Sequence, residues 1–209
     1  MTFFSDGDSG TPSPFVQAAN TWYDIRDTYI VRFVAEGCRK NLPLSGTGFP
    51  IVDLNDLSTR ALQFIGGGLF SQYCDAIGVR HPAVDELIAY VDSIAQSPDL
   101  YIWGEKLGLL EVHGLGDLPP PEIAAQLPYE IGGEFHHAVE SLVEIYMADH
   151  MGAVTDNPQR FTRELLAIVS THGISLPDLS VFVQPNGRRS LGDRADDETL
   201  QKWRAALRR

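Results

Sequence analysis

The sequence predicts an all-α protein: a single globular domain of about seven helices joined by short proline- and glycine-containing segments. Three observations support this prediction. Apolar residues recur at intervals of three and four along most of the chain. Proline follows a capping residue where several of these segments begin. No internal repeat, heptad run or low-complexity tract interrupts the pattern. With 209 residues, 44% of them hydrophobic and 21% charged, the chain can bury a substantial core.

The first helix is expected over residues 13–39, where Ser13 can act as the cap and Pro14 fits the first helical position. Residues 1–12 are rich in Gly, Ser, Asp and Pro, which predicts a mobile N-terminal tail ahead of a domain spanning 13–209. The sequence NLPLSGTGFP then breaks the helical pattern.

A second helix, expected at about 57–77, contains the run Gly66-Gly67-Gly68. Each glycine costs about 1 kcal/mol relative to alanine inside a helix. Either the helix breaks at this point, or a neighbouring helix approaches where no side chain intervenes. A phosphate-binding loop is the functional alternative, but the run lacks the following Lys-Ser/Thr and a preceding strand.

The middle of the chain predicts four further helices, with a proline-rich joint at about 115–121 as the candidate subdomain boundary. Beyond Gly173, an apolar stretch and the Asn186-Gly187 turn indicate a small hairpin near 180–190 as one option. The last segment is acidic at its start and basic at its end, as a helix dipole favours. The expected middle helices start at Pro82, run over 97–114 and 132–152, and start at Asn157.

The helix at 132–152 holds three of the six histidines. On a helical wheel its apolar stripe includes His150, with His136 at the edge. The opposite face, expected to be solvated, carries His137, Ser141 and Glu144. This pattern is typical of a core helix, and Leu142 is one of its expected core residues.

Two pairs on this helix have the spacing of metal ligands: Glu134 with His137, and His136 with Glu140. Di-iron bundles need a second Glu-x-x-His and further glutamates, and the sequence supplies no second copy. No metal or cofactor is therefore expected. The alternative is an enzyme or a small-molecule or metal pocket around His136, Glu140 and His150. His113 and Glu111 are possible recruits from another helix.

The formal net charge of −12 is unevenly distributed. Residues 188–209 contain seven Lys/Arg and four Asp/Glu, whereas residues 1–187 contain nine against 24. A body with a net charge of −15 should repel nucleic acids and anionic membranes and attract basic proteins. The simpler interpretation of this charge is solubility alone.

The common catalytic patterns are missing from the sequence: Gly-x-Ser-x-Gly, Walker and dinucleotide-binding motifs do not occur. Two cysteines, Cys38 and Cys74, are expected to be buried thiols in a reducing compartment. No signal peptide and no run of about 18 apolar residues are found, so a cytoplasmic location is expected. Three lysines beside 13 arginines suggest a GC-rich, bacterial genome.

These observations favour a non-catalytic binding protein for a basic partner. In general character the chain resembles the acidic immunity proteins and antitoxins that neutralise bacterial toxins, although no motif matches residue by residue. An acidic surface would speed association with such a partner. Aromatic anchors are considered at Trp22, Tyr101 and Trp103, with core packing as the alternative. The candidate contact residues are the acids Asp85, Glu86, Asp92, Glu134, Glu140 and Glu144.

Overall fold

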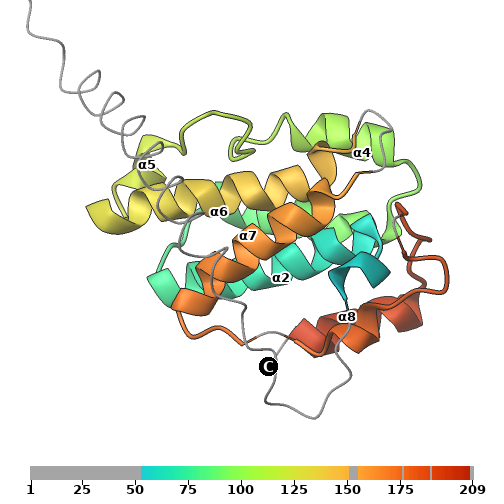
Figure 1. Ribbon diagram of the computed structural model, residues 1–209. Coiled ribbons are helices and arrows are strands. Elements are labelled where there is room, and N and C mark those ends of the chain that lie inside the picture. The colour runs from blue at the N-terminus through green and yellow to red at the C-terminus, as the bar shows by residue number, and fades with distance from the viewer. Residues whose placement is uncertain (1–52, 151–154, 176, 189, 208–209) are drawn as a thin grey trace, which may run out of the picture. The chain divides into compact units, whose positions relative to one another are not determined.

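The computed structural model describes residues 53–150, 155–175, 177–188 and 190–207, and this part of the chain is all-helical, without a strand. The expected all-α class is thereby confirmed (Figure 1). The tail at 1–12, the helix expected at 13–39 and Cys38 lie outside the described residues. The helices are η1 (Leu54–Asp56), α2 (Thr59–Ile77), α3 (Pro82–Asp92), η2 (Ser93–Gln96), α4 (Leu100–Leu107), α5 (Pro121–Ala124), α6 (Tyr129–Met147), α7 (Asn157–Thr171), η3 (Leu179–Phe182) and α8 (Asp197–Leu207).

Helix α2 is the central element. It contacts α3, α6, α7 and α8, and most of its residues are buried. Contacts at the middle and at the end of α2 show how it runs relative to α6 and α7. Gly66, in the middle of α2, faces Ile145 near the end of α6 and Leu165 in the middle of α7. Tyr73, near the end of α2, donates to Glu134 at the start of α6 and contacts the His172 ring at the end of α7. Helix α7 is therefore parallel to α2, and α6 is antiparallel to both (Figure 1).

The three consecutive glycines lie inside α2, so the helix does not break at them. Successive residues point about 100° apart, and each glycine meets a different helix. A Cβ on Gly66 would lie 2.8 Å from Ile145 Cδ1, and one on Gly68 would lie 2.5 Å from Leu207 Cδ1 of α8. A Cβ on Gly67 would lie 2.8 Å from Val91 Cγ1 of α3. Close helix packing on three sides explains the run, and the phosphate-loop alternative is wrong.

The hairpin considered near 180–190 does not form. Helix η3 occupies the first part of this stretch, and a turn follows it. The carbonyl groups of Ser190 and Leu191 accept hydrogen bonds from the backbone N–H groups of Thr59 and Arg60, at 2.9 and 3.1 Å. These donors belong to the first turn of α2, where no partner within the helix exists. The segment thus caps a helix instead of pairing with itself as strands.

Two expected helix boundaries are also wrong. The helix expected over 97–114 ends at Leu107, and the helix expected over 132–152 begins at Tyr129 and ends at Met147. After α4 the chain turns to cross α6: Gly114, at φ +68°, lies so close that its Cβ would be 3.1 Å from the Glu140 backbone. The described residues on both sides of 115–121 belong to one compact unit.

Candidate functional site

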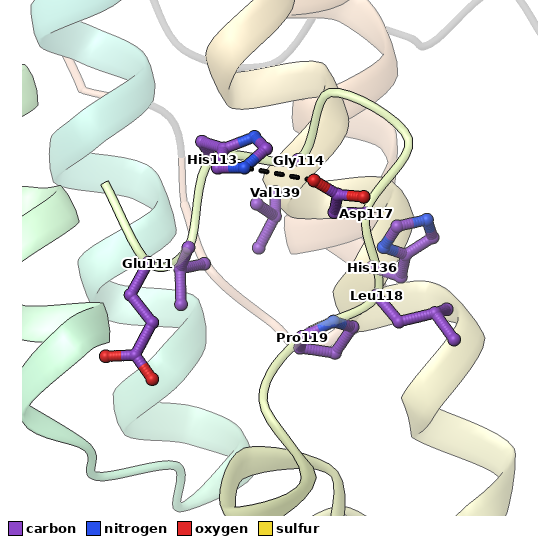
Figure 2. A pocket seen from close by; sticks show the side chains of 9 residues that line it. Glu111, His113, Gly114, Asp117, Leu118, Pro119, His136 and Val139 are labelled. Carbon is purple, nitrogen blue, oxygen red and sulfur yellow. Dashed lines mark ion pairs between the residues drawn. The ribbon is translucent and has the colours of Figure 1, made fainter. Parts of the chain in front are cut away.

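A small pocket forms where residues 111–119 cross α6 (Figure 2). Its volume is about 10 Å³, which is roughly the space that one water molecule needs. Drug-sized ligands occupy pockets of roughly 300 Å³ or more, so a substrate of that size does not fit. The lining residues are Glu111, Val112, His113, Gly114, Asp117, Leu118, Pro119, His136 and Val139.

Two histidine–carboxylate pairs lie at this pocket. His113 Nε2 is 3.2 Å from Asp117 Oδ2, and His136 Nε2 is 3.3 Å from Glu140 Oε1. The Leu115 N–H donates to His113 Nδ1, which places the proton of a neutral ring on Nε2, facing Asp117 (Figure 2). His113 in this state has both nitrogens engaged and offers no free lone pair for general-base catalysis.

The predicted pocket around His136, Glu140 and His150 is only partly assembled. Glu111 and His113 line the same pocket as His136, but they lie in the irregular segment after α4 and not on another helix. His150 lies beyond the end of α6 at Met147, which is itself 11 residues, or about 16 Å along the helix axis, from His136. The Tyr146 hydroxyl donates to the Leu100 carbonyl, so His150 Nδ1 must donate to that hydroxyl oxygen, 3.1 Å away. The structure therefore separates His150 from the other members.

His150 packs among aromatic rings at α4. Its ring stacks on Tyr101, with centroids 5.0 Å apart and an interplanar angle of 17°, and meets Tyr146 edge-on. A Cβ on Gly104 would collide with the His150 ring and lie 2.6 Å from Tyr146 Cε1. The glycine is thus required for this close approach, and His150 serves as a packed core residue.

The Glu-x-x-His pair on α6 also diverges. Glu134 Oε1 accepts from the Tyr73 hydroxyl at 2.9 Å and lies 2.6 Å from His172 Nε2. His137 instead lies near Glu164 of α7, at 4.0 Å, and burial lowers its pKa. Within the described ranges, no group of three or more His, Cys, Asp or Glu residues has the geometry of a metal site.

The expectation that one face of α6 is solvated is wrong, because α7 packs along α6. Ser141 is 1% exposed. Burial, followed by the neighbouring Glu140 carboxylate, raises the pKa of Glu144. A helical wheel identifies the most apolar face of a helix. It does not show that a second face, with both polar and apolar residues, is also buried against another helix.

The six nominated acids fall into two groups. Asp85 and Glu86 are exposed near the start of α3. Asp92 is partly buried, which raises its pKa, and the three acids of α6 lie partly buried beside histidines or other helices. All six acids were expected to be exposed, and of these six only Asp85 and Glu86 are.

Among the aromatic candidates, Trp103 is buried at 3% exposure and Tyr101 is 57% exposed, while Trp22 lies outside the described residues. The Trp103 indole donates to Ser93 Oγ, and its ring stacks on Tyr90. Cys74 is buried as expected, and burial raises the pKa of its thiol to about 12. Neither Trp103 nor Cys74 is available for surface chemistry.

Comparison with known proteins finds no matching family model, curated protein or solved structure. None of the helices in the described ranges combines the length and apolarity needed to cross a bilayer.

Proposed function

We propose that the protein is a non-catalytic binding protein for a basic partner protein, in the manner of an immunity protein or antitoxin that neutralises a toxin. The observation that carries the proposal is the scatter of the six histidines. His113 and His136 flank a water-sized pocket, and the other four serve separate local contacts. His81 caps α3, while His137, His150 and His172 contact α7, α4 and α6 respectively. Convergent rings in a larger cavity would favour chemistry instead.

The charge of the chain supports a basic partner. A formal net charge of −12 attracts a cationic surface and can raise the association rate of a complex by 10-fold or more. The exposed pair Asp85 and Glu86 remains a contact candidate from the sequence. Glu134 and Glu140 are less suitable, because each already interacts with a histidine.

The alternative, an enzyme with a pocket at His136 and Glu140, has less support. The cavity there is about 10 Å³, and His150 lies too far along the chain to contribute. A catalytic base must come within hydrogen-bond reach of its substrate, which this cavity allows only for a molecule the size of water.

The test is capture of partners from a native lysate with tagged full-length protein, at about 0.05 M and about 0.5 M salt. Screening shortens the reach of exposed charges at the higher salt. The proposal expects a stoichiometric partner with a high isoelectric point, bound at low salt and released at high salt. Capture of no protein, or only of acidic partners insensitive to salt, would contradict it.

A further inference from the structure

Large apolar side chains gather on one part of the surface, formed by α4 and the segment that follows it. Of the nine exposed large hydrophobic residues in the described ranges, five lie between positions 101 and 118. Contiguous apolar surface on a soluble protein commonly marks an interaction site. We call this surface the α4 face; its apolar members are Tyr101, Ile102, Leu109, Leu115 and Leu118, exposed by 57, 50, 82, 41 and 42%.

The members of the α4 face are neighbours in space. Tyr101, Glu105 and Leu109 follow one another at intervals of four, which places them along one side of α4 and the turn after it. Leu115 returns to the same end of the helix, since its Cδ1 lies 3.6 Å from the position of a Cβ on Gly108. Leu109 and Leu115 thus lie together at the C-terminal end of α4, and Tyr101 lies on the same side of the helix near its start.

The layer beneath this patch is fixed in position. The Tyr101 ring stacks on His150, and Gly104 presses directly on His150 and Tyr146. Trp103 points inward and is held by its hydrogen bond to Ser93. A rigid base reduces the entropy lost when a partner binds, so an exposed patch on it is well suited to recognition.

Acidic groups surround the apolar residues. Glu105, Glu111 and Asp117 are exposed on the same stretch, and Lys106 is the one basic residue between positions 99 and 118 apart from His113. Among the described residues, no Lys or Arg forms an ion pair with Glu105 or Asp117; these carboxylates lie near His150 and His113, at 4.0 and 3.2 Å. The face therefore combines exposed apolar side chains with exposed carboxylates.

We propose that the α4 face docks an amphipathic segment of the partner protein, with aliphatic side chains on one side and Lys or Arg on the other. The inference rests on the proposed function and specifies its surface and the partner's chemistry. Aliphatic groups would cover Leu109 and Leu115, and cations would approach Glu105 and Glu111. A second copy of this chain would bring like charges together, and an anionic lipid surface would meet the same repulsion.

The probe is a synthetic 14-residue amphipathic helix of Leu and Lys, titrated into the full-length protein and followed by calorimetry. Peptides of Lys alone and of Leu with Glu serve as references. We expect the Leu/Lys peptide to bind at least about tenfold more tightly than either reference, since it alone supplies apolar burial together with charge pairing.

Two double variants separate the apolar and charged contributions. One variant removes apolar surface and carries Leu109→Ser with Leu115→Ser. The other reverses charge and carries Glu105→Lys with Glu111→Lys. Each should weaken binding of the Leu/Lys peptide by roughly tenfold. The matched control is Asp75→Lys with Glu130→Lys, two exposed carboxylates on α2 and α6 that lie outside the α4 face and are not among the candidate contact residues. It makes the same change in net charge and should stay within about twofold of the wild type. Circular dichroism and thermal unfolding verify that each variant is folded.

The outcomes are distinct. Equal loss in the Asp75→Lys/Glu130→Lys control would show that net charge alone drives binding, which overturns the α4 face and leaves the proposed function intact. No binding of the Leu/Lys peptide by the wild type would overturn the stated partner chemistry, even if lysate capture yields a basic protein. Self-association that disappears in the Leu109→Ser/Leu115→Ser variant would assign the face to a second copy, and would overturn the inference.

Discussion

Two irregular segments of this protein, 183–195 and 108–118, differ in where their backbone hydrogen bonds go. The first bonds to distant elements: Ser190 and Leu191 accept from the start of α2, and the Ala195 N–H donates to the Ala95 carbonyl at 2.8 Å. In the second, the hydrogen bonds formed with other described residues are local and span two to four positions, as in the bond from Gly116 N to Gly114 O. The first segment completes the fold, whereas the second displays side chains on its surface.

The comparison shows how a fold leaves room for function. Long-range backbone bonds to α2 make 183–195 part of the cooperative structure, because breaking them exposes the first turn of α2. The segment 108–118 is attached mainly through buried Val112 and through Gly114 against α6. Its exposed leucines can therefore change with little effect on stability, which is the behaviour expected of a binding surface.

The largest expected effect contrasts a core leucine with a leucine of the α4 face. Leu142 of α6 is fully buried and packs against Gly66 of α2, so Leu142→Ala should lower the free energy of unfolding by about 2–5 kcal/mol. Leu109 is 82% exposed, so Leu109→Ala should change it by less than about 0.5 kcal/mol. Urea denaturation of both variants measures the difference; similar losses would mean that the α4 face is part of the core.

A second contrast uses a glycine from each segment. Gly192 and Gly116 have φ angles of +86° and +93°, so alanine is strained at either position, by roughly 1–2 kcal/mol. At Gly192 a Cβ would also collide with Ser58, whereas nothing lies within 4 Å at Gly116. Gly192→Ala should therefore cost about 1–3 kcal/mol more than Gly116→Ala. Equal melting temperatures for the two variants would contradict the tight packing of 183–195 on α2.

A third contrast compares Glu134, which stabilises the fold, with Glu111, which lies on the α4 face. Glu134→Ala would leave the fully buried Tyr73 without the acceptor of its hydroxyl proton, at a cost of about 1–3 kcal/mol. Glu111 is exposed, and Glu111→Ala should be neutral for stability within about 0.5 kcal/mol. Chemical denaturation distinguishes the two, and a neutral Glu134→Ala would remove Glu134 from the stabilising contacts.

The smallest expected effect concerns Glu144, whose pKa is raised by burial and by Glu140. Because the fold disfavours the ionised form, stability from this group is present below the ordinary pKa of 4.5 and is lost as pH rises through the raised value. Glu144→Gln should therefore raise Tm at pH 7, on the order of 2 °C, with a benefit that fades below pH 4.5. A benefit that is constant across pH would contradict this explanation.

Local features of the sequence predicted most of the fold, and the errors have physical causes. Prolines at helix starts and apolar spacing placed the helices within the described residues, including α3 and α7. The glycine run was left between two explanations, because the choice depends on packing against α3, α6 and α8, and the contacting residues Val91, Ile145 and Leu207 lie far from the run in sequence. The hairpin expectation was wrong because the carbonyl groups of Ser190 and Leu191 accept hydrogen bonds from the N–H groups at the start of α2, which lies more than 100 positions away.

The candidate site was less predictable than the fold. His113 and Glu111, considered as recruits from another helix, line the pocket with His136 but lie in the irregular segment after α4. His150 was grouped with them because helical spacing alone does not show that it lies beyond the far end of α6. Burial of Glu144 and Ser141 depends on where α7 lies. The exposure of Leu109 and Leu115 depends on the tertiary structure. From the sequence alone, apolar residues that follow a helix are expected to be buried.

The most direct test is hydrogen–deuterium exchange of the full-length protein, alone and with the Leu/Lys peptide. We predict that amides of 109–118 exchange faster than those of Thr59, Arg60 and Ala195 in the free protein, and that added peptide slows exchange over 101–118 alone. Slowing of exchange confined to α3 or α6 on addition of peptide would contradict the assignment of binding to the α4 face. Equal protection of both irregular segments in the free protein would contradict the structural role of 183–195.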